Sequence, residues 1–340
     1  MARPPARSLH VFVVGAGLSA SLNLPNTREL LQRVHDLAGR RRYWGLTRNL
    51  VPRLQNSYEF FYPEKSGTGF RPDVVDFFSL LKAYTEIGSG MSGGLRDSRA
   101  LLGDLRFAIA NALVFDLREI DNVLRSQHVE LNQILEPGNV VITLNWDLVL
   151  ERYCYLHGIP VRFDGWVDGS EVVLLKLHGS IDWTLRSQAA RPVTQKNYAV
   201  LRERLTTGRQ YTIPIRSGDK ILRTRAMESW NDSWRKIKSR TNAPFIVTMS
   251  QGKSDDLSKI DFIWRTAYDA LSAASEIEIV GYSMPHDDVE VRALLRAGIR
   301  RGSSAPRVTV RNPAPDVHDR VRNYLVRSLR SNYVPFPGFR

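Results

Sequence analysis

The sequence predicts an α/β fold built on a doubly wound parallel sheet, and three observations lead to it. Short runs of Val, Ile and Leu recur along the chain, as they do in strands buried on both faces of a parallel sheet. Segments with apolar residues at helical spacing separate several of these runs. Hydrophobic residues make up 43% and charged residues 24% of the 340 residues, which is ordinary for a globular protein with a sizeable core.

Six apolar runs predict strands of this sheet. They are HVFVV (10–14), NVVITL (139–144), VVLLKL (172–177), FIVTM (245–249), EIEIV (276–280) and RVTVR (307–311). Helical patterns lie between or after several of them. These patterns cover residues 27–38, 147–157, 257–274, 287–301 and 315–330. The alternation of the two kinds of segment is typical of a doubly wound sheet.

The first run also has an alternative interpretation as an export signal. Arginines precede the apolar residues of HVFVV and small residues follow them, as in a secretory signal peptide. The sheet needs this run as a strand, and we therefore interpret HVFVVGAGLSA (10–20) as a strand and a turn in a cytoplasmic protein. No other run approaches the roughly 18 apolar residues of a membrane span, so we expect no contact with a membrane.

Two insertions are expected within a single domain over residues 1–340. The first is helical and covers about 40–135, with apolar residues at helical spacing in 77–87 and 98–124. A dehydrogenase would have a second strand within about 30 residues of the first, ending in a ribose-binding acid, so this region argues against a plain dehydrogenase. The second insertion covers about 186–240, which has little hydrophobic periodicity.

The charge of the chain is concentrated in this second insertion. The whole chain has a net charge of +13, and residues 186–240 contain fourteen Lys or Arg against four acidic residues, a net of +10. Such a segment is either a solvated arginine-rich surface or a site for an anionic partner such as nucleic acid. The single cysteine, Cys154, excludes an intramolecular disulfide and a zinc site made of four cysteines.

Polar or glycine residues follow five of the predicted strands. GAGLSA fits G-x-G-x-x-G/A, with Gly15 and Gly17 in the glycine positions, although a plain strand-to-helix turn has the same letters. Asn145 and Asp147 follow the second strand in ITLNWD, where Asp147 is alternatively a helix cap. His178 follows the third strand in LLKLHGSIDW, where a structural histidine is the alternative.

The last two motifs complete the set. IVGYSMPHDD brings Gly281 and Ser283 to the end of one strand, and VTVRNP brings Asn312 to the end of another. Ligands of open α/β sheets bind at the carboxyl ends of the strands. Because five strand ends have residues of this kind, we expect a ligand site there.

Taken together, the motifs resemble a sirtuin-type NAD-binding domain of Rossmann-type topology. The matching segments, in the same order as in sirtuins, are GAGLS (15–19), TLNWD (143–147), HG (178–179), GYS (281–283) and RNP (311–313). Two features depart from deacetylating sirtuins, namely the missing zinc-binding cysteines and LPNTREL in place of GxPDFR. Both departures, together with KLHGSIDW and GYSMPHDD, resemble the sirtuin-like NADases of bacterial antiphage defence.

This resemblance implies an NAD+ glycohydrolase that uses NAD+ as substrate and requires no metal. It implies that Asn145 and His178 are catalytic. The remaining residues that it implies in NAD+ binding are Gly15, Ala16, Gly17 and Ser19 at the pyrophosphate, Asp147 at the nicotinamide end, Gly281 and Ser283 at a phosphate or ribose, and Asn312 at the adenine side. It also implies gating by a homo-oligomer or by a separate sensor protein.

Two other functions stay open at the level of the sequence. One is an NAD-dependent protein deacylase or ADP-ribosyltransferase. The other is a non-catalytic module that senses nucleotides or associates with nucleic acid through residues 186–240.

Overall fold

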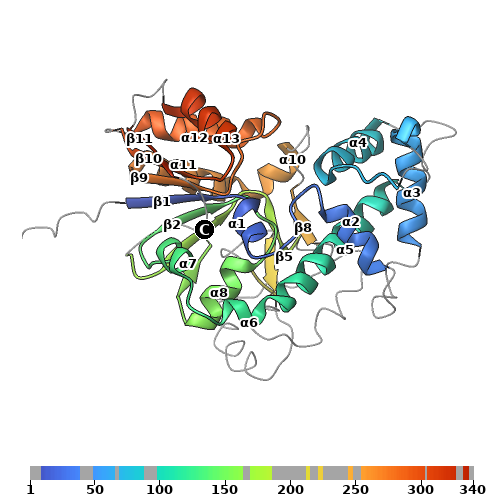
Figure 1. The fold of residues 1–340 in the computed structure, drawn as a ribbon, viewed down its shortest axis with the longest axis horizontal. Coiled ribbons are helices and arrows are strands. Elements are labelled where there is room, and N and C mark those ends of the chain that lie inside the picture. The colour runs from blue at the N-terminus through green and yellow to red at the C-terminus, as the bar shows by residue number, and fades with distance from the viewer. Residues whose placement is uncertain are drawn as a thin grey trace, which may run out of the picture. The chain divides into compact units, whose positions relative to one another are not determined.

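The computed structural model forms two compact units (Figure 1). The sheet unit contains Met1–Leu22, Asp121–His178 and Ile260–Arg340, and the second unit contains Asn23–Ile120 and Gly179–Lys259. The structure describes residues 9–38, 49–65, 69–87, 98–163, 169–185, 212–214, 221–224, 244–247, 254–302, 305–326 and 332–336. The single domain expected over residues 1–340 stays a prediction.

The sheet unit is built on a seven-stranded sheet in which every neighbouring pair is parallel. In spatial order its strands are β11 (Asn332–Phe336), β10 (Arg307–Arg311), β9 (Ala274–Val280), β1 (Leu9–Val14), β2 (Val140–Thr143), β4 (Val172–Lys176) and β3 (Val161–Arg162). All residues of β2 and β4 are buried, as expected for strands covered on both faces. The predicted α/β fold with a parallel sheet is confirmed.

The strand order reverses at β1, as it does in a doubly wound sheet. From β1 the chain adds β2 and β4 on one side, and later adds β9 and β10 on the other. Val14 of β1 pairs with Thr143 and Val280, Thr143 pairs with Lys176, and Val280 pairs with Arg311. Five strands therefore end at the same level, and the residues that follow them share one edge of the sheet, which we call the carboxyl edge.

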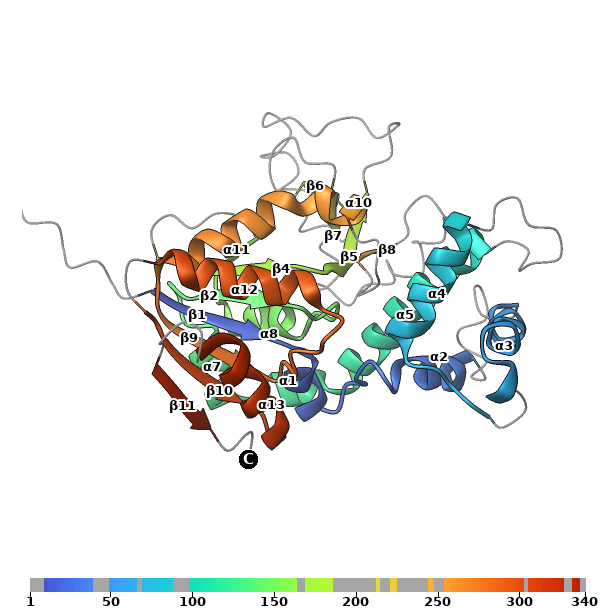
Figure 2. The same ribbon diagram turned by 90° about the horizontal axis from the view of Figure 1, so that it is seen from above.

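The helices of the sheet unit are α1 (Ala16–Ser21), α6 (Asp121–Leu124), α7 (Val129–Ile134), α8 (Val149–His157), α11 (Asp261–Ala273), α12 (Val289–Arg301) and α13 (Pro315–Val321), which continues as a π-helical turn at Arg322–Val326. In α11, Phe262, Ile263, Ala270 and Leu271 form a buried apolar stripe, and this helix packs against β1, β4 and β9. Figure 2 shows α11 and α12 side by side.

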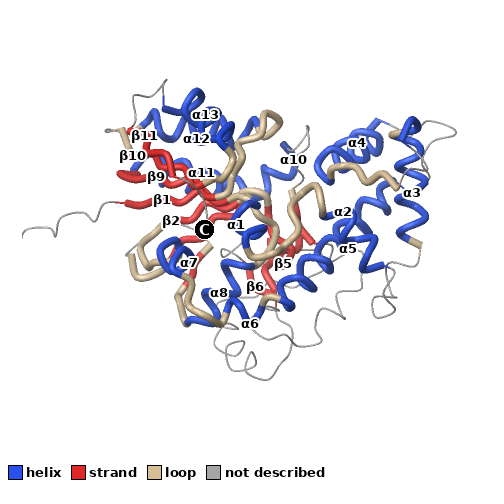
Figure 3. The backbone as a smooth tube through the Cα atoms, viewed as in Figure 1, coloured by secondary structure: helices blue, strands red, loops and turns tan. Residues whose placement is uncertain are grey.

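The second unit combines four longer helices with a small antiparallel sheet (Figure 3). Its helices are α2 (Leu30–Ala38), α3 (Leu50–Phe61), α4 (Val74–Ile87), α5 (Ser98–Glu119) and the short α10 (Ser254–Leu257), with 3-10 turns at Pro63–Lys65 and Ser258–Ile260. Its sheet has the order β6 (Thr212–Pro214), β7 (Ile221–Thr224), β5 (Gly179–Leu185), β8 (Pro244–Ile246). Arg33 of α2 ties this helix to Asp116 of α5, with its Nε 2.8 Å from Asp116 Oδ1.

One predicted strand was placed in the wrong sheet. FIVTM (245–249) was expected in the parallel sheet, but β8 lies in the second unit and pairs antiparallel with β5. A short apolar run shows that a strand is buried and does not show in which direction its neighbour runs. Apart from β6 and β7, the basic insertion (186–240) lies outside the described residues. Among the helices that the structure describes, none is long and apolar enough to cross a membrane.

Candidate functional site

The carboxyl edge of the sheet unit brings the predicted site residues into one row. Thr143 and Lys176 are paired in the sheet, and Asn145 and His178 each follow two residues beyond this pair. The two predicted catalytic residues therefore stand at equivalent positions of neighbouring strands. Parallel strands lie about 4.8 Å apart, so side chains at equivalent positions are close enough to act on one small molecule.

The glycines of the first turn allow backbone to pack on backbone. Gly15 N–H donates to Val280 O at 2.9 Å, and Gly17 N–H donates to Gly281 O at 2.9 Å. A Cβ atom on Gly15 would lie 2.6 Å from Tyr282 Cα, and one on Gly17 would lie 2.7 Å from Gly281 O. Both amides are thus engaged by the β9 turn, which supports a packing role for these two glycines.

Gly281 has its own conformational reason to be glycine. Its φ of +61° lies in the left-handed region, and a Cβ there would lie 2.4 Å from the backbone nitrogen of Leu18. The two glycine-containing turns, after β1 and after β9, are therefore fitted to each other at the point where the strand order reverses. Open α/β sheets bind ligands at such a switch point.

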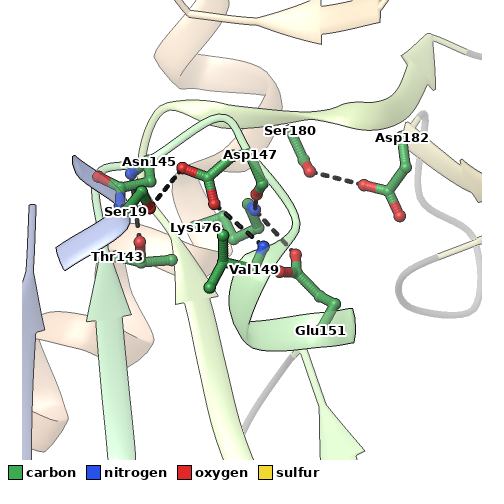
Figure 4. Close-up of polar contacts among 9 residues, drawn as sticks. All are labelled: Ser19, Thr143, Asn145, Asp147, Val149, Glu151, Lys176, Ser180 and Asp182. Carbon is green, nitrogen blue, oxygen red and sulfur yellow. Dashed lines mark hydrogen bonds and ion pairs between the residues drawn. The ribbon is translucent and has the colours of Figure 1, made fainter. Parts of the chain in front are cut away.

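Ser19, Asn145 and Asp147 form a buried chain of hydrogen bonds (Figure 4). The amide Nδ2 of Asn145 donates to Ser19 Oγ at 3.0 Å and to Gly15 O at 3.1 Å. The Ser19 hydroxyl in turn donates to Asp147 Oδ2 at 2.7 Å. Because Nδ2 is committed to these two acceptors, the amide oxygen of Asn145 has a fixed direction. That oxygen accepts no hydrogen bond from the described residues, and so it offers an acceptor to a ligand.

Asp147 also has the structural role that its sequence position suggested as an alternative. Its Oδ1 accepts a hydrogen bond from Val149 N–H, the first residue of α8, at 3.1 Å. One carboxylate oxygen therefore supports the start of the helix, and the other accepts from Ser19. Both oxygens are occupied, and this arrangement makes Asp147 a support for Asn145 through Ser19.

Lys176 and Glu151 also belong to this site, although no motif of the sequence pointed to them. Lys176 is 1% exposed, and its Nζ donates to the backbone oxygen of Asp147 at 2.5 Å and to Glu151 Oε1 at 2.8 Å (Figure 4). The pair ties the turn after β2 to β4 and α8. A lysine inside the apolar run VVLLKL was the available signal, because a buried lysine is almost always paired.

His178 is fully buried, and neither ring nitrogen has a hydrogen-bond partner among the described residues. Asp288 lies within ion-pair distance, with its Oδ1 3.6 Å from His178 Nε2. Tyr282 donates its hydroxyl to Asp288 Oδ2 at 2.9 Å. Burial, and then the Asp288 charge and this hydrogen bond, raise the pKa of Tyr282 well above its ordinary value, so the phenol stays a donor at neutral pH.

The remaining predicted residues have other local contacts. Ser283 is exposed, and its backbone oxygen accepts from Arg320 Nη1 at 2.8 Å. The Oδ1 of Asn312 accepts from Ala314 N–H at 3.0 Å, immediately before α13 begins with Pro315. Asn312 thus forms an Asx turn at a helix start. Within the described residues, neither side chain is hydrogen-bonded to the Asn145 cluster.

No group of three or more His, Cys, Asp or Glu within the described residues could hold a metal ion.

Comparisons with known proteins give a weak structural similarity. No protein-family model matches the sequence, and no curated protein matches it. Among solved structures, one described as "Structural Basis for the Mechanism and Regulation of Sir2 Enzymes" shares 14% sequence identity with this chain. The match has a TM-score of 0.36 and covers 98% of this chain and 88% of that one. A TM-score of 0.36 is too low to transfer any property of that protein to this chain.

Proposed function

We propose that this protein is an NAD+ glycohydrolase, which hydrolyses NAD+ to ADP-ribose and nicotinamide. The observation that carries the proposal is the pair Asn145 and His178, each two residues beyond the paired ends of β2 and β4. Asn145 has a fixed amide oxygen, and His178 is an imidazole with unused nitrogens. The resemblance of the five strand-end motifs to sirtuin-like NADases names NAD+ as the substrate.

The reaction needs an acceptor and a base in these positions. The bond between the nicotinamide nitrogen and ribose C1′ breaks, and its electron pair neutralises the pyridinium ring as nicotinamide leaves. A water oxygen forms the new bond to C1′, and the water gives up one proton. The Asn145 oxygen orients the water or a ribose hydroxyl, and His178 takes the proton and passes it to solvent. Positioning and electrostatics supply most of such an acceleration.

The roles of the other predicted residues follow from their contacts. Ser19 and Asp147 hold Asn145, and Lys176 and Glu151 hold the turn that presents it. Ala16 is half-buried and Gly17 is exposed at the start of α1, and we place the pyrophosphate beside this turn. The amides of Gly15 and Gly17 donate to the turn after β9, so these glycines, with Gly281, shape the turn for the ligand through its packing. Ser283 and Asn312 remain proposed contacts of the phosphate or ribose and of the adenine side.

The direct test is to incubate the purified protein with NAD+ and to measure nicotinamide and ADP-ribose by chromatography. Equal amounts of both products, formed without any acylated peptide, are the expected result. A requirement for an acylated peptide would replace the proposal with a deacylase, and transfer of ADP-ribose to protein would replace it with a transferase. Binding of NAD+ with neither product would indicate a sensing module.

In the cell we propose that the enzyme is a cytoplasmic effector of antiphage defence that depletes NAD+. An ungated NADase would drain its own cell, so we expect low basal activity that rises on homo-oligomerisation or on binding a separate sensor. Residues 186–240, with their net charge of +10, are the proposed contact for an anionic partner or nucleic acid. Such a contact should weaken steeply as salt rises, because phosphate contacts release counterions. Full activity of a monomer in any salt would contradict this gating.

A further inference from the structure

His178 stands out because it is a buried polar group without partners. Its side chain is 0% exposed, and both Nδ1 and Nε2 lack a hydrogen bond among the described residues. Nearly all buried polar groups in native proteins are paired, because an unpaired one loses its hydration without replacement. Both ring nitrogens of His178 are therefore available for hydrogen bonds. A group that accepts the proton of one nitrogen fixes the tautomer, and the other nitrogen then has the free lone pair.

Asp288 is the group placed to satisfy one of these sites. Its carboxylate is 0% exposed, and Oδ1 lies 3.6 Å from His178 Nε2. Hydrogen bonds of this kind span about 2.7–3.2 Å, so a shift of less than about 1 Å would form one. Catalytic hydrogen bonds are often long in a protein without its substrate and tighten in the complex.

The carboxylate of Asp288 is itself held in place. Tyr282 donates to its second oxygen at 2.9 Å. Asp288 stands immediately before α12, where Arg292 N–H donates to its backbone oxygen at 3.1 Å and its own N–H donates to Pro285 O at 3.3 Å. Both the side chain and the backbone of Asp288 are therefore anchored, with Oδ1 3.6 Å from the imidazole.

We propose that Asp288 is the positioning residue of His178. Its carboxylate accepts the Nε2–H of the imidazole, which fixes the tautomer whose Nδ1 has the free lone pair. This rests on the proposed function, in which Nδ1 takes the proton of the attacking water as the water oxygen bonds to ribose C1′. Asp288 stays ionised and stabilises the imidazolium that forms, and the proton then leaves Nδ1 for solvent. Tyr282 is the third member of this arrangement of His178 and Asp288, because its hydroxyl holds the Asp288 carboxylate in place.

Two other charged groups face Tyr282 beside the pair. Asp287 and Arg292 both act on the Tyr282 hydroxyl, with opposite signs, and Asp287 is exposed. From α11, Trp264 Nε1 donates to the backbone oxygen of Leu177, next to His178, and brings no charge. Asp288 is the carboxylate within ion-pair distance of the ring in the described structure.

The test compares Asp288→Asn with Asp287→Asn, which makes the same chemical change one residue away on the surface. Histidine labelled with 15N distinguishes Nδ1–H from Nε2–H tautomers by NMR, and His178→Gln identifies the His178 signals. We expect His178 to be held as the Nε2–H tautomer in the wild type and in Asp287→Asn. In Asp288→Asn we expect a mixture of tautomers. This readout needs no NAD+ and separates the proposal from the proposed function.

Kinetics give the second readout. Asp288→Asn should lower kcat for NAD+ by about 10²- to 10⁴-fold, since replacing the carboxylate that orients a general-base imidazole by an amide costs up to about 10⁴. KM should change less than threefold, because Asp288 is buried and does not touch the substrate.

Each outcome has a clear meaning. An unchanged tautomer in Asp288→Asn, or a kcat equal to that of Asp287→Asn, would overturn the proposal. A changed tautomer in a protein that never hydrolyses NAD+ would leave Asp288 as the positioning residue and refute the proposed function. If Asp288→Asn fails to fold, Tyr282→Phe keeps both partners and removes only the hydrogen bond that holds Asp288, so it should lower kcat about three- to tenfold and weaken the preference of His178 for one tautomer. A wild-type kcat and tautomer in Tyr282→Phe would then count against the proposal.

Discussion

Ser19 Oγ lies 3.0 Å from Asn145 Nδ2, although the two residues are far apart in sequence. Ser19 comes from α1 after the first strand, and Asn145 comes from the turn after β2. The hydroxyl accepts from the amide and passes its own hydrogen to Asp147. The direction of the Asn145 side chain is therefore determined before any substrate arrives.

Replacing Ser19 with alanine should break this chain of hydrogen bonds while both proposed catalytic residues remain. Asp147 Oδ2 loses its donor and Asn145 loses an acceptor, and leaving buried groups unpaired costs about 1–3 kcal/mol. We expect a fall of about this size in the free energy of unfolding, measured with urea, and a roughly tenfold lower kcat, which corresponds to about 1.4 kcal/mol. Ser21→Ala on the same helix is the control, since its hydroxyl bonds only to Leu18 O. Equal effects of the two variants would contradict the assigned role of Ser19.

Removing either proposed catalytic side chain should remove the activity and spare the fold. We expect His178→Ala to lower kcat for NAD+ by about 10²- to 10⁴-fold, the range for a lost general base. Asn145→Ala should lower it by about 10²- to 10³-fold, the range for a lost polar contact to the reacting group. Nicotinamide release measures both, with circular dichroism as the check on folding. His286→Ala, at an exposed histidine, should be fully active. Near wild-type turnover in either site variant would refute the mechanism.

Replacing only one residue of the buried pair Lys176 and Glu151 should strongly lower the free energy of unfolding. Lys176→Met removes the ammonium that pairs with the buried Glu151 at 2.8 Å, and breaking a buried ion pair from one side costs about 3–5 kcal/mol. The double variant Lys176→Met/Glu151→Leu should lose less than the sum of the two single variants, because it removes both charges of the pair. Urea denaturation measures all three. The exposed pair Arg265 and Asp261 is the control, where Arg265→Met should change stability by less than about 0.5 kcal/mol.

The second unit should lose stability in mild acid because of His35. Burial, and then the charge of Arg71, lower the pKa of His35 from 6.5 to about 4. Between these values the unfolded chain binds a proton that the folded chain does not, so stability is highest above pH 6.5 and falls as the pH drops toward 4. His35→Gln should flatten this dependence in thermal unfolding measured from about pH 4 to pH 7. His286→Gln, at an exposed position, should leave it unchanged. A wild-type dependence in His35→Gln would assign the acid sensitivity to other groups.

Alanine substitutions at Gly17 and Gly103 should change the stability of the protein in opposite directions, because only Gly17 lies against another turn. Gly17→Ala would place a Cβ 2.7 Å from Gly281 O, and overpacking of this kind costs about 1–3 kcal/mol. Gly103, inside α5, has no atom within 4 Å of an added Cβ, so Gly103→Ala should stabilise the protein by about 0.4–1 kcal/mol. Thermal unfolding compares the two. A neutral Gly17→Ala would mean that the turns separate readily.

The sequence was most informative where a strand is buried on both faces. The runs at β1, β2 and β4 consist mostly of apolar residues, whereas β9 and β10 alternate Val or Ile with charged or polar residues. Each of the five strands is predicted within two residues of its bounds. The run at β8 was equally apolar and was assigned to the wrong sheet, because pairing direction is set by distant residues. The two-residue strand β3 and the polar start of β5 gave no such pattern.

In the site, the sequence likewise predicts the residues that follow apolar strands and does not predict the partners that distant segments supply. Asn145 and His178 could be predicted because each directly follows an apolar run, and a parallel sheet brings such positions together. The partners of Lys176 and His178 could not be predicted. Glu151 lies within a helix and Asp288 lies far along the chain, and only the folded sheet brings them near Lys176 and His178.

The sheet unit is assembled from three separated stretches of chain, and this has a consequence for its biosynthesis. β1 lies between β2 and β9, so while a ribosome is still making residues 23–273 one side of β1 has no partner strand. An unpaired strand edge invites wrong pairing, and late pairing of distant segments is slow. The glycine turn after β1 meets Gly281, and His178 meets the carboxylate of Asp288, only after these later residues have emerged from the ribosome. A nascent chain that ends before Asp288 therefore cannot complete this edge of the sheet or any chemistry that the edge supports.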